Sequence, residues 1–138
     1  MCRKPMLLCV LNQKEEDNMN YKFPTTLEEY INEHRKMWTW IAEETLRQKK
    51  KVSKYDYLSK YNIYNILDGN CWMCEYAYKK TKGDCNNCPL QWLDVDGIEI
   101  SCCCESPDSL YRVWCDEDDY EKSADLAYKI ANLKEKEE

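Results

Sequence analysis

Four cysteines in the middle of the chain form two C-x2-C pairs, at Cys71, Cys74, Cys85 and Cys88. A C-x2-C turn places two sulfurs on one side of an ion, and two such turns supply the four thiolates of a structural tetrahedral Zn²⁺. Ten residues separate the pairs, which is long enough to bring the second turn back against the first. The spacing predicts one closed four-cysteine zinc site without a vacant ligand position.

The same four cysteines could serve purposes other than binding zinc. The thiolates would also suit a rubredoxin-like iron centre, because geometry alone does not exclude iron. Disulfides would need an oxidising compartment. A thioredoxin-like centre uses one C-x2-C in a βαβ context that this sequence lacks. Unligated thiols in the core are the simplest alternative. We favour zinc, with iron second, on spacing and expected compartment.

The remaining cysteines are weaker metal candidates, although ten in 138 residues is far above ordinary usage. Cys102, Cys103 and Cys104 are consecutive, so alternate members of an extended segment face opposite sides. Three residues could contribute to a second site or replace a ligand of the first: Cys102, Cys104 and Cys115. Burial as small apolar side chains is the more common outcome.

The N-terminal run MLLCVL follows a basic start but is too short for a secretory signal, and no cleavage site follows it. No stretch approaches the roughly 18 to 20 apolar residues that span a bilayer. We therefore expect a cytoplasmic protein with reduced thiols and no membrane partner. Because Met19 begins a natural-looking start, residues 1–18 are expected to be a disordered leader upstream of it.

Helical periodicity dominates the rest of the chain. Thr26 and Glu29 form a capping box ahead of an apolar stripe that continues to about residue 50. Ser53 and Asp56 predict a short second helix, with Tyr55, Tyr57, Leu58 and Tyr61 facing the core. Further helices are predicted at residues 107–115 and 117–133.

Asp96-Gly97 predicts a short hairpin between the cysteine pairs and these last helices. The fold class expected is α+β: a mainly helical single domain, residues 19–134, with that hairpin and a zinc-knuckle or ribbon-like insert built on the two cysteine pairs. Residues 135–138 are predicted to be a solvated tail.

Charge is distributed unevenly along a chain with a net charge of −6. Residues 84–125 carry twelve acidic side chains against only Arg112 and Lys122. This segment could engage a basic protein surface, and its run of four acids gives the partner-binding candidates: Asp116, Glu117, Asp118 and Asp119. Alternatively, these carboxylates bind no partner and are only solvated at the start of the last helix, where the positive end of the helix dipole favours them.

A basic cluster after the first helix supports nucleic-acid binding as the second hypothesis. Its members are Arg47, Lys49, Lys50, Lys51 and Lys54. Cations beside exposed aromatic side chains can hold phosphates while bases stack. A pI near 5.0 would confine such binding to one patch.

Catalysis is not expected. The single histidine, His34, lies on or beside the apolar stripe of the first helix, where a histidine is usually a core residue. Glu75 follows Cys74 directly and Pro89 follows the second pair, so the zinc-deaminase pattern fails. Three glycines could hardly supply a phosphate-binding loop.

Several stretches, most specifically MWTWIAEET, CWMCEYA and CNNCPLQW, resemble a family of small uncharacterised proteins encoded by phages and prophages of Gram-positive bacteria. The resemblance extends over about residues 26–133 and implies a zinc-binding domain of viral or mobile-element origin, without implying an activity. The triplet of Cys102, Cys103 and Cys104 departs from that pattern. We expect an accessory protein of the bacterial cytoplasm that binds a host protein, such as a host enzyme or defence complex.

Overall fold

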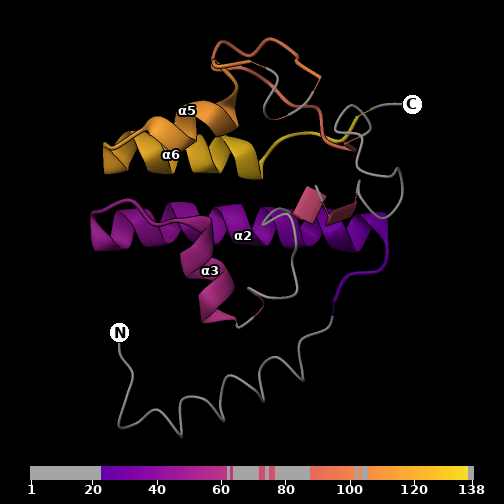
Figure 1. Cartoon of the computed structure of the whole chain (residues 1–138), viewed down its shortest axis with the longest axis horizontal. Helices are drawn as coiled ribbons and strands as arrows, with labels where there is room; N and C mark the ends of the chain where they lie inside the picture. The colour runs from indigo at the N-terminus through magenta and orange to yellow at the C-terminus, as the bar shows by residue number, and fades with distance from the viewer. Residues whose placement is uncertain are drawn as a thin grey trace, which may run out of the picture.

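The computed structural model describes residues 23–61, 63, 72–73, 75–76, 88–101, 103 and 106–136. Four helices run through this part of the chain: α2 (Leu27–Gln48), α3 (Lys54–Lys60), α5 (Leu110–Asp116) and α6 (Tyr120–Ala131). In Figure 1, α6 lies alongside α2, α5 sits beside α6, and α3 branches from the other side of α2. The prediction of a mainly helical, single small domain is confirmed. The predicted leader, residues 1–18, lies outside the described residues.

α2 begins and ends where local chemistry dictates. The Thr26 hydroxyl accepts from the Glu29 N–H at 3.1 Å, and the Glu29 carboxylate accepts from the Thr26 N–H at 3.2 Å, so the predicted capping box is confirmed. At the other end Lys49 takes φ 57°, the left-handed region, and its N–H donates to the Thr45 carbonyl. Leu46, expected in the apolar stripe, is 41% exposed.

In α3 the predicted N-terminal cap is confirmed, but only some of the side chains predicted to face the core are buried. The Ser53 hydroxyl accepts from the Asp56 N–H at 3.3 Å, and Tyr57 and Leu58 are buried. Tyr55 and Tyr61 are 50% and 36% exposed, so their predicted burial was wrong. A helix of seven residues has one narrow buried face, and the two adjacent side chains Tyr57 and Leu58 fill it.

Aromatic side chains of α2 and α5 form the centre of the core. Trp38 is 1% exposed. Its ring is nearly perpendicular to the rings of Trp114 and Tyr111, with centroid-to-centroid distances of 4.7 and 6.1 Å. α6 contributes mostly small or aliphatic side chains to the same core, namely Ala124, Leu126, Ala127, Ile130 and Ala131. Tyr57 of α3 and two residues outside these four helices, Trp72 and Trp92, add further large buried side chains to this core.

Both C-terminal helices begin later than predicted. α5 begins at Leu110 rather than at Pro107, because Ser109 is the N-cap and its hydroxyl accepts from the Arg112 N–H at 3.1 Å. α6 begins at Tyr120 rather than at residue 117, because Asp119 is its N-cap. Pro107 therefore precedes the helix instead of opening its first turn. The capping side chains decided both starts.

Residues 88–101 form an irregular layer joined by isolated antiparallel bridges: Leu90 with Glu135, Leu93 with Glu99, and Asp94 with Ser109. A tight turn closes at Asp96 and Gly97, where Gly97 has φ 86°. No strand forms among the described residues, so the predicted hairpin is reduced to one bridged turn. Two backbone hydrogen bonds close this turn, from the Asp94 N–H to the Ile98 carbonyl and from the Ile100 N–H to the Trp92 carbonyl, each at 2.9 Å. The Asp94 carboxylate supports the turn by accepting from the N–H groups of Asp96 and Ile98, each at 2.9 Å.

None of the helices in the described ranges combines the length and apolarity needed to cross a membrane.

Candidate functional site

Cys88 is the one predicted zinc ligand that the described residues include. Its side chain is 7% exposed, and the indole Nε1–H of Trp92 donates to its Sγ at 3.4 Å. The adjoining backbone is paired with the chain beyond α6, since the Lys136 N–H donates to the Pro89 carbonyl at 2.8 Å. A buried, fixed sulfur with an N–H donor is a suitable metal ligand.

The first cysteine pair also has buried neighbours. Trp72 and Met73, which separate Cys71 from Cys74 in the sequence, are 0% and 1% exposed. The Trp72 ring lies 5.5 Å from Phe23 and 6.5 Å from Tyr30 at the start of α2. The core therefore holds the chain beside the first pair as well as beside the last cysteine.

Most of the remaining predicted ligands fall outside the part of the chain that the structure describes. Cys71, Cys74, Cys85, Cys102 and Cys104 lie outside the described residues. Cys115 is exposed on α5, and Cys103 is half-buried with its carbonyl accepting from the Ser109 hydroxyl at 2.6 Å. Within the described part of the chain, no three His, Cys, Asp or Glu side chains gather to hold a metal ion. The four-cysteine site stays a prediction from the sequence.

His34 is buried at the contact between α2, α6 and the 88–101 layer. Its Nε2 lies 3.1 Å from the Ile130 carbonyl, which can only accept, so Nε2 carries the hydrogen. The Trp92 ring meets the imidazole edge-on at 6.2 Å. Burial lowers the pKa of His34 to about 4, against the opposing effect of the Ile130 hydrogen bond. A neutral imidazole at pH 7 agrees with the predicted core role.

The basic cluster is largely occupied by contacts within the chain. Lys51 Nζ donates to the Cys115 carbonyl at 3.0 Å and to the Trp114 carbonyl, and it lies 4.7 Å above the Trp114 ring. Lys54 Nζ donates to the Tyr111 hydroxyl at 2.7 Å. These two lysines therefore attach the region after α2 to α5, and Lys51 compensates the negative end of α5.

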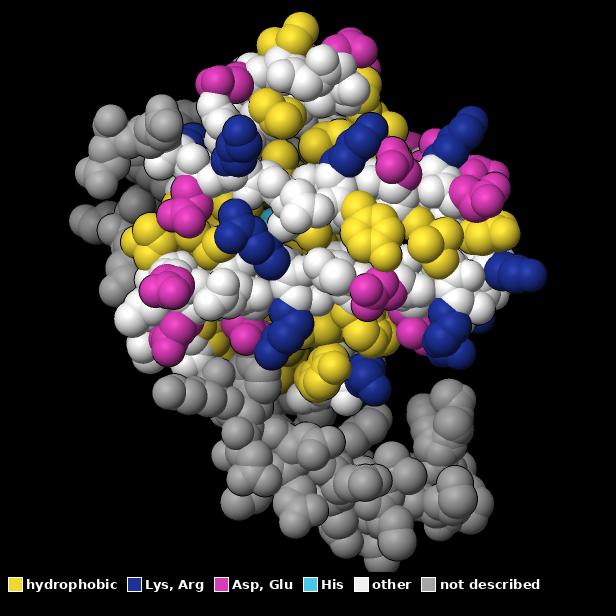
Figure 2. Space-filling model, turned by 180° about the vertical axis from the view of Figure 1, so that it is seen from behind, with side chains coloured by type: hydrophobic (Ala, Val, Ile, Leu, Met, Phe, Trp, Pro, Cys, Tyr) yellow, Lys and Arg dark blue, Asp and Glu magenta, His cyan; other side chains and the backbone are white. Residues whose placement is uncertain are grey.

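The other cations of the cluster point to solvent. Arg47 pairs with Glu44 on the same helix, and this guanidinium lowers the pKa of the Glu44 carboxyl to about 2. Lys49 and Lys50 are exposed. Figure 2 shows basic and acidic side chains interspersed across the visible face, separated by apolar ones. That face offers no continuous basic surface.

The predicted acidic run, residues 116–119, spans the junction between α5 and α6. The carboxylates of two of its members accept hydrogen bonds from backbone N–H groups at this junction. Glu117 accepts from the Asp119 N–H at 3.1 Å, and Asp119 accepts from the Lys122 N–H at 2.9 Å. Asp116 and Asp118 are exposed. The alternative reading, in which the run solvates the start of the last helix, fits only part of it, because Asp116 ends α5 and Asp119 is the N-cap of α6.

A groove of about 560 Å³ follows this junction, and we call it the acidic groove. Val113 and Leu126 supply its apolar side chains. Its charged lining consists of Glu117, Asp119, Glu121, Lys122 and Asp125. Four carboxylates against one ammonium give this groove a strongly negative potential.

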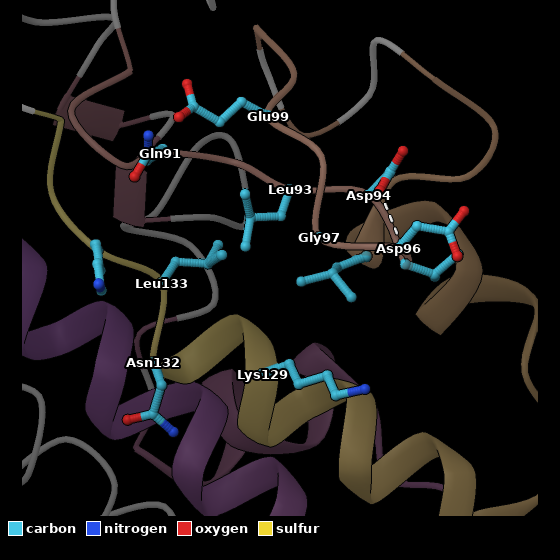
Figure 3. Close-up of a pocket in the computed structure, with 12 residues that line it drawn as sticks. Gln91, Leu93, Asp94, Asp96, Gly97, Glu99, Lys129, Asn132 and Leu133 are labelled. Atoms are coloured by element: carbon cyan, nitrogen blue, oxygen red, sulfur yellow. Dashed lines mark hydrogen bonds between the residues drawn. The ribbon is translucent and has the colours of Figure 1, made fainter.

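A second hollow of about 660 Å³ lies between the 93–99 turn and the end of α6. Figure 3 shows Leu93 and Leu133 directed into it and Asp94 turned back toward its own loop. Lys129, on its rim, pairs with Asp125 at 3.2 Å. Asp94 and Lys129 therefore hold the turn and the helix through contacts of their own.

Comparisons of the chain with protein-family models, curated proteins and solved structures found no match. The functional argument therefore depends on this chain's own residues.

Sequence reasoning missed two arrangements. The Trp92 contact with Cys88 could have been predicted from the sequence, because the CPLQW stretch places an indole donor four residues after a proposed ligand. The anchoring of Lys51 on α5 had no such signal, since the two partners are 63 residues apart in the chain.

Proposed function

We propose that this chain is a phage or prophage accessory protein that binds a basic surface on a host protein through the acidic groove. A single zinc ion, held by Cys71, Cys74, Cys85 and Cys88, stabilises the irregular part of the fold. The acidic groove is the observation that supports this proposal. The viral setting and the choice of a host enzyme or defence complex as target depend on the sequence resemblance.

The acidic groove suits a partner that presents lysine or arginine beside an apolar side chain. Carboxylates on both α6 and the preceding junction would attract the cations, while Val113 and Leu126 would contact the apolar group. Charge complementarity of this kind raises association rates and excludes acidic partners. Nucleic acid is among the partners that it excludes.

Zinc would serve as a structural metal in this proposal. Four thiolates complete a tetrahedral shell and leave no position for a substrate. The donor set fits, because Cys88 is buried and its sulfur already receives an N–H hydrogen bond. Bound zinc would hold the two cysteine pairs together beside the core positions of Trp72 and Met73.

The alternative, a nucleic-acid-binding module, has less support from the arrangement of charges. Of its five cations, Lys51 and Lys54 contact α5 and Arg47 pairs with Glu44. Lys49 and Lys50 alone would make too few phosphate contacts for firm binding at physiological salt. We therefore favour a protein partner.

The test is affinity capture from expressing cells with two charge variants. The groove variant combines Glu121→Gln and Asp125→Asn, which line the groove, with Asp116→Asn and Asp118→Asn of the adjoining acidic run. It spares Glu117 and Asp119, whose carboxylates accept backbone hydrogen bonds. The control variant neutralises four exposed carboxylates on other elements: Glu28, Glu43, Asp96 and Glu99. Both variants change the net charge equally.

We expect one host protein to be captured by the parent chain and the control variant, and to be lost or weakened at least tenfold with the groove variant. Binding measured with the purified partner should weaken as salt is raised. Equal capture by both variants would reject the acidic groove as the binding site. Recovery of specific nucleic acid, with binding abolished by neutralising Lys49 and Lys50, would favour the alternative instead.

A further inference from the structure

Trp92 and Cys88 are joined by a buried side-chain contact that the sequence did not predict. The indole Nε1–H donates to Sγ at 3.4 Å, and the two residues are 2% and 7% exposed. We propose that Trp92 is a positioning residue of the metal centre, holding the Cys88 thiolate in place and offsetting part of its charge. This inference rests on the proposed zinc site.

The chemistry of the donor favours a thiolate as its partner. An indole N–H can only donate, and a buried N–H without an acceptor is costly. A neutral thiol is a weak acceptor, whereas hydrogen bonds to ionised acceptors are about twice as strong as neutral ones. The contact with Trp92 therefore gains most when Cys88 is a metal-bound thiolate.

Contacts with two parts of the fold orient the Trp92 ring. The His34 ring is perpendicular to it, with the ring centroids 6.2 Å apart, and the His34 Nε2–H is itself bonded to the Ile130 carbonyl of α6. The Trp92 carbonyl accepts from the Ile100 N–H at 2.9 Å. The indole donor is thus aimed at the sulfur by the helical core and by the 93–99 turn.

The electrostatic benefit is specific to a site with four thiolates. Zn²⁺ with four thiolates carries a net charge of −2, which a buried environment disfavours. An N–H dipole directed at one sulfur reduces that cost, and it also orients the ligand. Loss of such an outer partner typically weakens metal affinity about 10- to 100-fold.

The chain provides a matched control for this effect. Trp114 is also buried, at 4% exposed, and its Nε1 has no hydrogen-bond partner among the described residues. Phenylalanine at either position removes an indole ring of equal size. Only the change at Trp92 removes an N–H group that contacts sulfur.

The experiment uses the full chain loaded with zinc, and compares the parent with Trp92→Phe and Trp114→Phe. Zinc affinity is measured by competition with a chromophoric chelator. With Co²⁺ in place of zinc, the thiolate-to-metal charge-transfer band is recorded. We expect Trp92→Phe to bind zinc about 10- to 100-fold more weakly and to shift this band to lower energy, since an N–H bond stabilises the sulfur lone pairs. Trp114→Phe should leave the band unchanged.

The outcomes separate this inference from the proposed zinc site. Equal affinities and bands for the two variants would overturn the role of Trp92 while leaving the site intact. A parent chain without stoichiometric zinc, or zinc retained after Cys88→Ser, would overturn both. If Trp92→Phe does not fold, replacing Trp92 with β-benzothienylalanine keeps the ring volume and removes the N–H. An unshifted cobalt band in that variant would then reject the inference.

Discussion

The α2–α6 pair and the 88–101 layer are built in opposite ways. The helices bury continuous faces, and each begins at a side-chain cap, Thr26 for α2 and Asp119 for α6. The 88–101 layer contains no strand within its described residues and is held by isolated bridges to segments near residues 109 and 135. A few buried side chains, including Cys88, Leu90 and Trp92, attach it to the core.

This difference shows where an added constraint is most effective. A helix satisfies most of its backbone hydrogen bonds internally, so α2 and α6 need neighbours chiefly to bury their apolar faces. The 88–101 layer satisfies its backbone through distant partners, and its ordering depends on each of them. A structural metal at one end of that layer would stabilise it far more than it would stabilise the helices.

Metal removal should give the largest effect. Zinc contributes about 10–16 kcal/mol of apparent binding free energy in zinc-finger peptides. With chelator present, we expect amide hydrogen exchange in residues 88–101 to increase strongly while exchange in α2 changes little, because α2 keeps its own buried face. Exchange measured by mass spectrometry checks this. A uniform increase in both regions would show that the two regions unfold as one unit.

Among single substitutions in the helical region, we expect Trp38→Ala to lower the free energy of unfolding most. Trp38 is 1% exposed and contacts Trp114 at 4.7 Å, so truncation should lower the free energy of unfolding by about 3–5 kcal/mol. Urea denaturation of the zinc-loaded protein measures it. Ile98→Ala is the control in the other region, since Ile98 is 62% exposed and should change stability by less than about 0.5 kcal/mol. Similar losses for both would contradict the assigned core.

His34 links the two regions and should make stability depend on pH. Its folded pKa is about 4 against an ordinary 6.5, so the unfolded chain takes up a proton first as pH falls. Stability from this group is full above about pH 6.5 and declines toward pH 4, by about 3 kcal/mol in total. His34→Gln retains an Nε2–H donor but does not titrate. Between pH 6.5 and 4 the parent should therefore lose more stability than this variant, as measured by urea denaturation. Identical pH profiles for the two proteins would contradict the lowered pKa of His34.

Lys49→Gly should give the smallest effect, and a stabilising one. Lys49 has φ 57° at the end of α2, a conformation that glycine adopts without a Cβ penalty. We expect a gain of about 0.5–1 kcal/mol in the free energy of unfolding. Lys50→Gly is the control, because the residues with positive φ in the described chain do not include Lys50. Thermal unfolding compares the two, and a loss of stability in Lys49→Gly would contradict the cap geometry.

Prediction from the sequence succeeded where the signals were local. The capping boxes of Thr26 with Glu29 and Ser53 with Asp56 were visible as residue spacing, and both are present. It failed where a neighbouring element decides exposure. Tyr55 and Tyr61 were predicted to face the core but are exposed, and the buried side chains of α3 are Tyr57 and Leu58.

The four-cysteine site stays a prediction from residue spacing, and the contacts that surround its described member, Cys88, were not predicted. The C-x2-C spacing specifies four thiolates, and CPLQW contains the donor that contacts one of them. The basic cluster illustrates the opposite case. As a sequence it predicts a phosphate-binding patch, yet Lys51 and Lys54 lie against Trp114 and Tyr111 of a helix more than 50 residues away.

By itself, the sequence determined the presence of the helices, the capping boxes of the first two and the excess of negative charge, because each depends on residues close together in the chain. The zinc ligands stay a prediction from the same kind of local spacing. Only the tertiary structure decided which charges remain available. Packing of α5 against the region after α2 engaged Lys51 and Lys54, and packing of α5 against α6 created the acidic groove. It also aimed Trp92 at Cys88, since the orientation of that ring depends on His34 and on the Ile130 carbonyl of α6.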